Sequence, residues 1–259
     1  MSLLRSFCIA FSMYSKIPMP KLSWNKKDMR YTMCFFPLIS IPIALFILLW
    51  FYICQWLHIG SLLFAGVATA IPVLLTGGIH LDGYCDTVDA LSSRQPQEKK
   101  LEILKDPHTG AFAILFSCLY FLLYAGFTSE LTNSLNGVLL LMCSFFISRC
   151  VSGFAVVTFR SAKSSGLLHT FKDTAQKRTV AITMVGYLLA AIALLFVINW
   201  FIAFFVLFGA ATTFIYVRVM CYRQFGGITG DIAGYLVQLC ELTTLIGIVA
   251  GLLIERVVF

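Results

Sequence analysis

Residues 181–217 read AITMVGYLLAAIALLFVINWFIAFFVLFGAATTFIYV, a run of 37 residues without Asp, Glu, Lys or Arg. A membrane-spanning helix needs about 20 consecutive apolar residues, so this run is too long for one ordinary span. Asn199 and Trp200 lie near its middle and supply a polar break and an aromatic residue suited to the membrane interface. The run therefore predicts a tight helical hairpin with spans at 181–198 and 201–217.

The whole chain has the same apolar character. Of its 259 residues, 59% are hydrophobic and only 12% are charged, which is more apolar surface than a soluble domain of this length can bury. Soluble enzymes, disordered chains and disulfide scaffolds are excluded. The net charge of +7 is assigned to loops that face anionic membrane lipids and an anionic substrate, not to binding of nucleic acid. The nine cysteines lack metal-ligand spacing and are expected to be buried.

Further apolar stretches of spanning length occur at 33–54, 61–79, 110–127, 136–157 and 232–254. With the hairpin they predict an all-α, polytopic integral membrane bundle of about seven transmembrane helices, or six if 181–217 crosses once. No linker or clear internal repeat interrupts the sequence, so 1–259 is expected to form a single membrane-embedded domain. The sequence leaves open whether the protein is a homo-oligomer.

Basic residues are distributed unequally between alternate connections. Seventeen of the nineteen Lys and Arg residues fall in 1–32, 80–109, 158–180 and 218–231, whereas 55–60, 128–135 and 199–200 carry none. Basic loops stay on the cytoplasmic side of a membrane, so the N-terminus is predicted to be cytoplasmic and the C-terminus outside. We expect a multi-pass protein of the cell membrane, the inner membrane in a two-membrane cell.

Acidic residues gather on the predicted cytoplasmic side. Six of the twelve lie at or near helix ends there, namely Asp82, Asp86, Asp89, Asp106, Asp231 and Glu241. The first three belong to GGIHLDGYCDTVDA at 77–90, where their i, i+4, i+7 spacing places them on one helix face continuous with the second span. Three close carboxylates repel one another unless a cation lies between them, and Mg²⁺ or Mn²⁺ also binds phosphate oxygens. The alternative is a solvated helix end with three unrelated acids.

The hexapeptide KDPHTG at 105–110 ends the same connection. Asp106 is a candidate to complete the metal site, and Lys105 and His108 are candidates to contact a phosphate. A capped helix start explains the hexapeptide about as well, and His108 is equally compatible with an interfacial histidine.

A third motif, RQFGGITGD at 223–231, precedes the last span. Glycines and a hydroxyl before a helix N-terminus offer N–H groups to an anion, and the substrate-binding candidates here are Arg223, Gly227, Thr229 and Gly230. Asp231 either binds metal or caps the helix. Glu241 lies roughly 15 Å deeper and is either functional, as a candidate metal ligand, or a hydrogen-bonded residue between helices. Arg149, inside a span, either pairs with an intramembrane acid or extends to the cytoplasm.

Together these motifs resemble those of the cobalamin (adenosylcobalamin 5′-phosphate) synthases, also called adenosylcobinamide-GDP ribazoletransferases. The resemblance rests on the motif at 77–89, on KDPHTGAF at 105–112 and on GITGD at 227–231 with the downstream Glu241, and it extends to IPMP at 17–20 and to the entry of the first span from Tyr31 to Pro37. Tyr84, Cys85 and Gln238 are atypical for that family.

The resemblance implies an Mg²⁺-dependent transferase. In the implied reaction, the 3′-hydroxyl of α-ribazole or its 5′-phosphate attacks adenosylcobinamide-GDP and GMP is released. Asp82 and Asp86 are the candidate catalytic aspartates, and the base is His80 or a spare aspartate. The rivals are a CDP-alcohol phosphatidyltransferase, whose Asp-Gly-x-x-Ala-Arg run does not match this sequence, an aspartate-rich prenyltransferase and a cation-coupled transporter. A transporter would place its ionisable residues near the membrane midplane.

Overall fold

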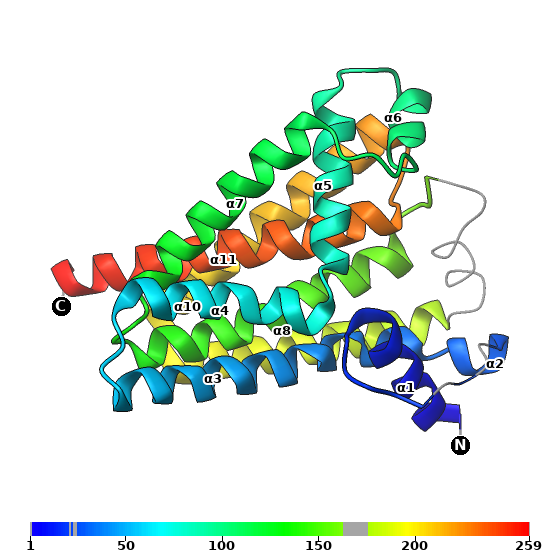
Figure 1. The fold of residues 1–259 in the computed structure, drawn as a ribbon. Coiled ribbons are helices and arrows are strands. Elements are labelled where there is room, and N and C mark those ends of the chain that lie inside the picture. Colours follow the sequence, from blue (N-terminus) through cyan, green and yellow to red (C-terminus); the bar gives the residue numbers. More distant parts are fainter. Residues whose placement is uncertain (1, 21, 23–24, 163–175, 259) are drawn as a thin grey trace.

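The computed structural model describes residues 2–20, 22, 25–162 and 176–258, and most of this part of the chain is helical. Its elements are α1 (Ser2–Tyr14), α2 (Lys26–Met29), the 3₁₀ helix η1 (Thr32–Ile39), α3 (Ser40–Trp56), α4 (Ser61–Thr76), α5 (Ile79–Ser92), α6 (Gln97–Ile103), α7 (Ala111–Ser129), α8 (Leu135–Thr158), α10 (Lys177–Phe225) and α11 (Gly230–Val258). The long helices lie side by side, and α1, α2, α5 and α6 gather at the end of the bundle opposite the C-terminus (Figure 1).

The predicted all-α membrane bundle is confirmed. Among the described residues, five helices are long and apolar enough to cross a membrane, or six if the bent pair α4 and α5 counts as one span. Helices α8 and α11 form the centre of the bundle. In their most apolar 18-residue stretches, 78% and 61% of the residues are buried, whereas the corresponding share in α7 is 22%. Large apolar side chains exposed on the outer helices suit contact with lipid.

The predicted hairpin is present within α10. This element is 49 residues long, and its backbone leaves the helical region at Asn199 (φ −159°, ψ 105°), where two helical segments meet. The Asn199 side chain accepts a hydrogen bond from the Ile202 N–H (3.0 Å) and donates one to Glu255 at the end of α11 (2.8 Å). The polar residue that signalled the break therefore begins the second segment, and α10 supplies two of the seven predicted spans.

The second predicted span, 61–79, needs correction. Helix α4 ends at Thr76, Gly77 and Gly78 both adopt left-handed backbone conformations (φ 67° and 75°), and α5 then leaves at 95° to α4. Two successive left-handed residues are inexpensive only for glycine. The acidic face therefore does not continue the apolar span, and α5 is a separate helix that packs across the beginning of α11.

Helix α1 and η1 close the bundle beside this bend. Arg5 of α1 forms an ion pair with the buried Asp28 of α2 (2.8 Å), which fixes α1 to the chain that enters η1. After α1, the Lys16 N–H donates a hydrogen bond to the Leu75 carbonyl of α4 (2.7 Å). The N-terminal segment is thereby held against the α4 to α5 bend.

Candidate active site

Helices α5 and α11 cross in direct backbone contact because each carries a glycine at the crossing. A Cβ atom on Gly83 would lie 2.6 Å from the Asp231 carbonyl oxygen, and one on Gly234 would lie 3.0 Å from the His80 carbonyl oxygen. Any side chain at these positions would push the helices apart. The crossing therefore joins the first and third sequence motifs, which lie far apart along the chain.

A cavity of about 220 Å³ lies beside this crossing. Its walls come from α1, η1, α5, α8 and α11, and its lining includes Tyr14, Phe36, His80, Asp82, Ser152 and Asp231. Sequence reasoning identified the histidine and the two aspartates. It missed the residues from α1, η1 and α8, because only tertiary packing brings those elements to the motif.

His80 is held firmly in the wall of this cavity by contacts with two aromatic rings. The side chain is only 4% exposed, stacks on the Tyr14 ring (centroids 6.0 Å apart) and meets the Phe36 ring edge to face (5.5 Å). Within the described part of the chain, Nε2 has no hydrogen-bond partner. A buried polar atom without a partner is costly, so it marks a place where a ligand atom would be stabilised.

Thr229 caps helix α11. Its hydroxyl oxygen accepts a hydrogen bond from the Ile232 N–H (3.2 Å), and the same hydroxyl donates to the Asp231 carboxylate (3.2 Å). The alternative role considered for Asp231, capping this helix, is therefore filled by Thr229. Gly230 is exposed at the edge of the cavity, and the Asp231 carboxylate is left close to a helix N-terminus, where negative charge is favourable.

Asp89, the third aspartate of the first motif, caps helix α7. Its two carboxylate oxygens accept hydrogen bonds from the N–H groups of Gly110 (2.7 Å) and Ala113 (2.8 Å). A Cβ atom on Gly110 would lie 2.7 Å from both oxygens, so the close approach requires glycine there. Asp89 thus ties the connection between α6 and α7 to α5.

The KDPHTG motif lies on this exposed connection. Lys105, Asp106 and His108 are all exposed. Asp106 accepts a hydrogen bond from the His108 N–H (2.9 Å) and lies 2.7 Å from the His108 ring Nδ1. The hydrogen bond from the His108 backbone N–H lowers the pKa of Asp106 most, and the hydrogen bond with the His108 ring lowers it further. The motif therefore forms a local turn whose proposed contacts with metal and phosphate stay predictions.

The glycine loop before α11 uses its amides within the protein. The Gly227 N–H donates to the Cys221 carbonyl (3.1 Å), and the Ile228 N–H donates to the Arg160 carbonyl (2.8 Å). Arg223 is exposed at the end of α10. Sequence reasoning missed the buried Lys100 of α6, whose ammonium group donates to Gln224 beside this loop.

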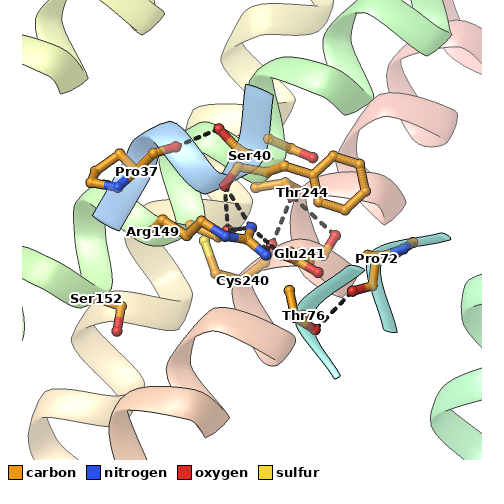
Figure 2. Close-up of polar contacts among 12 residues, drawn as sticks. Pro37, Ser40, Pro72, Thr76, Arg149, Ser152, Cys240, Glu241 and Thr244 are labelled. Carbon is orange, nitrogen blue, oxygen red and sulfur yellow. Dashed lines mark hydrogen bonds and ion pairs between the residues drawn. The ribbon is translucent and has the colours of Figure 1, made fainter. Parts of the chain in front are cut away.

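Helices α8 and α11 are joined by a buried ion pair (Figure 2). Arg149 Nη1 lies 2.7 Å from Glu241 Oε1, and both side chains are 1% exposed. Ser148 donates a hydrogen bond to the same carboxylate oxygen (3.3 Å), and Arg149 also donates to the Phe145 carbonyl (2.9 Å). Of the two roles considered for Arg149, pairing with an intramembrane acid is confirmed, and Glu241 is that acid.

The six candidate carboxylates lie in different surroundings: the cavity and its vicinity, the cap of α7, the exposed turn and the buried ion pair. Among the residues that the structure describes, no group of three or more His, Cys, Asp or Glu side chains is arranged to hold a metal ion. Asp82 and Asp231 line one cavity, and the half-buried Asp86 follows one turn along α5. Magnesium is commonly held by one or two carboxylates together with water and substrate phosphates. The residues therefore fit a cation that binds with an anionic substrate better than a preformed protein cage.

Comparisons with known proteins agree with the motifs. The model of the family described as cobalamin-5-phosphate synthase matches residues 6–249. The adenosylcobinamide-GDP ribazoletransferase of Lachnoclostridium phytofermentans is 48% identical over 93% of this chain and 92% of its own length. Those of Clostridium perfringens strain SM101 and Treponema denticola are 33% and 32% identical, each over 93% of this chain and 96% of their own length. No solved structure matches significantly. The chain belongs to the cobalamin-5-phosphate synthase family.

Proposed function

We propose that this protein joins adenosylcobinamide-GDP to α-ribazole, or to α-ribazole 5′-phosphate, and releases GMP. Membership of the family confirms the predicted class of enzyme, a transferase of cobalamin synthesis. The observation that carries the specific reaction is the near full-length similarity to relatives named adenosylcobinamide-GDP ribazoletransferase. The site agrees with it, because two carboxylates share one cavity beside an aromatic wall.

The reaction is a displacement at phosphorus. The ribazole hydroxyl oxygen forms a bond to the cobinamide-linked phosphorus, the bond from that phosphorus to the GMP oxygen breaks, and the hydroxyl proton passes to a base. His80 and an aspartate that does not hold the metal are the candidate bases. Asp82 and Asp231, with Asp86 nearby, would hold Mg²⁺. When bound, Mg²⁺ neutralises the charge that develops on the diphosphate oxygens.

We also propose that the cavity opens toward the cytoplasm. The support is the distribution of basic residues, because the stretch 80–109, which contains most of α5 and all of α6, is one of the four that carry nearly all of the Lys and Arg. Cysteines introduced at Ser92 and at Asn133, in a background without reactive native cysteines, would test this in intact and opened cells. A membrane-impermeant reagent should reach Asn133→Cys from outside and Ser92→Cys only after opening. The reverse pattern would invert the topology.

The activity itself is tested with purified protein in detergent. Adenosylcobinamide-GDP, α-ribazole and Mg²⁺ should yield GMP and adenosylcobalamin in equal amounts, and chelation of the metal should stop both. The same preparation is then given a CDP-alcohol and a lipid acceptor as the control for the rival function. Release of CMP there, without GMP in the first assay, would contradict the proposal and favour the phosphatidyltransferase.

A further inference from the structure

We infer that the cavity beside His80 holds the aromatic base of the acceptor nucleoside, and that His80 recognises this base by a hydrogen bond. The inference rests on the proposed function and goes beyond it, because it assigns one part of one substrate to one place. It depends on the size of the cavity, on the polarity of its walls and on its position beside Asp82 and Asp231.

Size restricts what can enter. The cavity has a volume of about 220 Å³, below the roughly 300–1,000 Å³ typical of pockets that enclose a whole drug-sized ligand. The corrin macrocycle of the donor is much larger than such a ligand. A single fused aromatic ring system matches the available space, which leaves two kinds of base, the purines of the donor (guanine and the adenine of its adenosyl group) and the benzimidazole of the acceptor.

The walls favour the less polar of these two bases. Met13, Met33, Phe36 and Val156 contribute apolar surface. Away from the Asp82 and Asp231 carboxylates, the hydroxyl groups of the wall are engaged within the protein, since the Ser152 hydroxyl donates to the Ala233 carbonyl (2.9 Å). The Tyr14 hydroxyl, which belongs to the same wall, donates to the Met33 sulfur (3.7 Å).

His80 Nε2 is the cavity's buried side-chain atom without a partner in the described part of the chain. Both purines of the donor carry an amino group and several ring nitrogens, and guanine also carries a carbonyl; each polar group left unpaired here would cost about 1–3 kcal/mol. The benzimidazole of α-ribazole has an apolar fused ring and one free ring nitrogen. That nitrogen can accept one hydrogen bond, and the neutral His80 tautomer that carries its hydrogen on Nε2 donates one.

The position of the cavity suits this occupant. His80 precedes Asp82 by two residues on α5, and the Asp231 carboxylate belongs to the same cavity. A base held against His80 carries its ribose toward these carboxylates, where the attacking hydroxyl meets the diphosphate. In this arrangement His80 is a binding residue that determines specificity, and the proton of the hydroxyl passes to an aspartate that does not hold the metal.

Binding without turnover provides the first test. Radiolabelled α-ribazole is equilibrated with the full-length protein in detergent and EDTA, so that no reaction occurs. His80→Phe keeps the ring contacts with Tyr14 and Phe36 but removes the N–H, and it should weaken α-ribazole binding about five- to tenfold. Its melting temperature should not fall, because the variant removes a buried polar atom that has no partner. The KM for adenosylcobinamide-GDP should stay unchanged.

A filling variant and an altered ligand complete the experiment. Met33→Trp should abolish α-ribazole binding, whereas the matched control Ala211→Trp, in the apolar groove between α8 and α10, should not. The indole riboside, which carries C–H in place of the free ring nitrogen, should bind the wild type as weakly as α-ribazole binds His80→Phe. The affinity for the indole riboside should be the same in His80→Phe as in the wild type.

Three results would overturn the inference while leaving the proposed function intact. The first is an unchanged α-ribazole affinity in His80→Phe with a lower kcat, which would make His80 the base. The second is a raised KM for adenosylcobinamide-GDP in Met33→Trp, which would assign the cavity to a purine of the donor. The third is equal binding of α-ribazole and the indole riboside. Failure of the wild type to release GMP would instead contradict the proposed function.

Discussion

Asp82→Asn is expected to lower kcat by about 10²- to 10³-fold, whereas Asp89→Asn is expected to keep most of the activity. The two aspartates belong to one motif and have equal charge, but their surroundings differ. Asp82 is exposed and lines the cavity, while Asp89 accepts hydrogen bonds from two N–H groups at the start of α7. Asn retains the size of Asp at both sites, so the comparison isolates the negative charge.

The physical reason is the demand for charge at the diphosphate. An amide at position 82 cannot balance the cation that neutralises the leaving group, so the transition state loses several kcal/mol of stabilisation. An amide at position 89 still accepts one of the two hydrogen bonds from the start of α7, so its cost falls on the cap of α7 and not on the charge of the cavity. Asp231→Asn should resemble Asp82→Asn, because Thr229 caps α11 in its place.

The measurement is kcat for each purified variant across a Mg²⁺ titration, with helical content and melting temperature as the control for folding. Weaker apparent Mg²⁺ affinity is expected for Asp82→Asn and Asp231→Asn alone. A well-folded Asp82→Asn within about tenfold of the wild type, which corresponds to about 1.4 kcal/mol, would contradict the metal assignment. An equal loss of kcat and of apparent Mg²⁺ affinity in Asp82→Asn and Asp89→Asn would indicate that Asp89 also holds the metal.

Features that depend on local composition could be predicted from the sequence. Apolar runs of spanning length identified the membrane helices, and Asn199 identified the hairpin, because a polar side chain inside an apolar run needs a local hydrogen-bond partner. The resemblance of the motifs identified the family. Each of these signals is carried by neighbouring residues and does not depend on the tertiary structure.

The division of labour among the carboxylates could not be predicted in this way. The i, i+4, i+7 spacing puts three aspartates on one face of α5, but whether Asp89 meets a metal or a helix N-terminus depends on where α7 begins in space. The direction in which α5 leaves α4 could not be predicted from the sequence either. Gly77 and Gly78 permit a sharp turn, but its angle of 95° and the close contact of Gly83 with α11 are tertiary features that the local sequence does not specify.

Breaking the ion pair between α8 and α11 should destabilise the protein more than any other single change considered above. Arg149→Leu or Glu241→Leu leaves an unpaired charge in the most buried part of the bundle, and each is expected to cost about 3–5 kcal/mol of unfolding free energy. The double variant removes both charges and should recover most of that loss. Arg256→Leu is the matched control, because it removes an exposed charge near the end of α11 and should change stability by less than about 0.5 kcal/mol.

Unfolding in mixed detergent micelles measures these differences, and the double variant separates the two roles of Glu241. If Glu241 acts only as the partner of Arg149, a folded double variant should retain the apparent Mg²⁺ affinity of the wild type. If Glu241 binds metal, that affinity should fall even though stability is recovered. A double variant no more stable than the single ones would show that the two charges do not compensate each other. The pair would then not be what holds α8 to α11, the helix whose first turn brings Asp231 to the cavity.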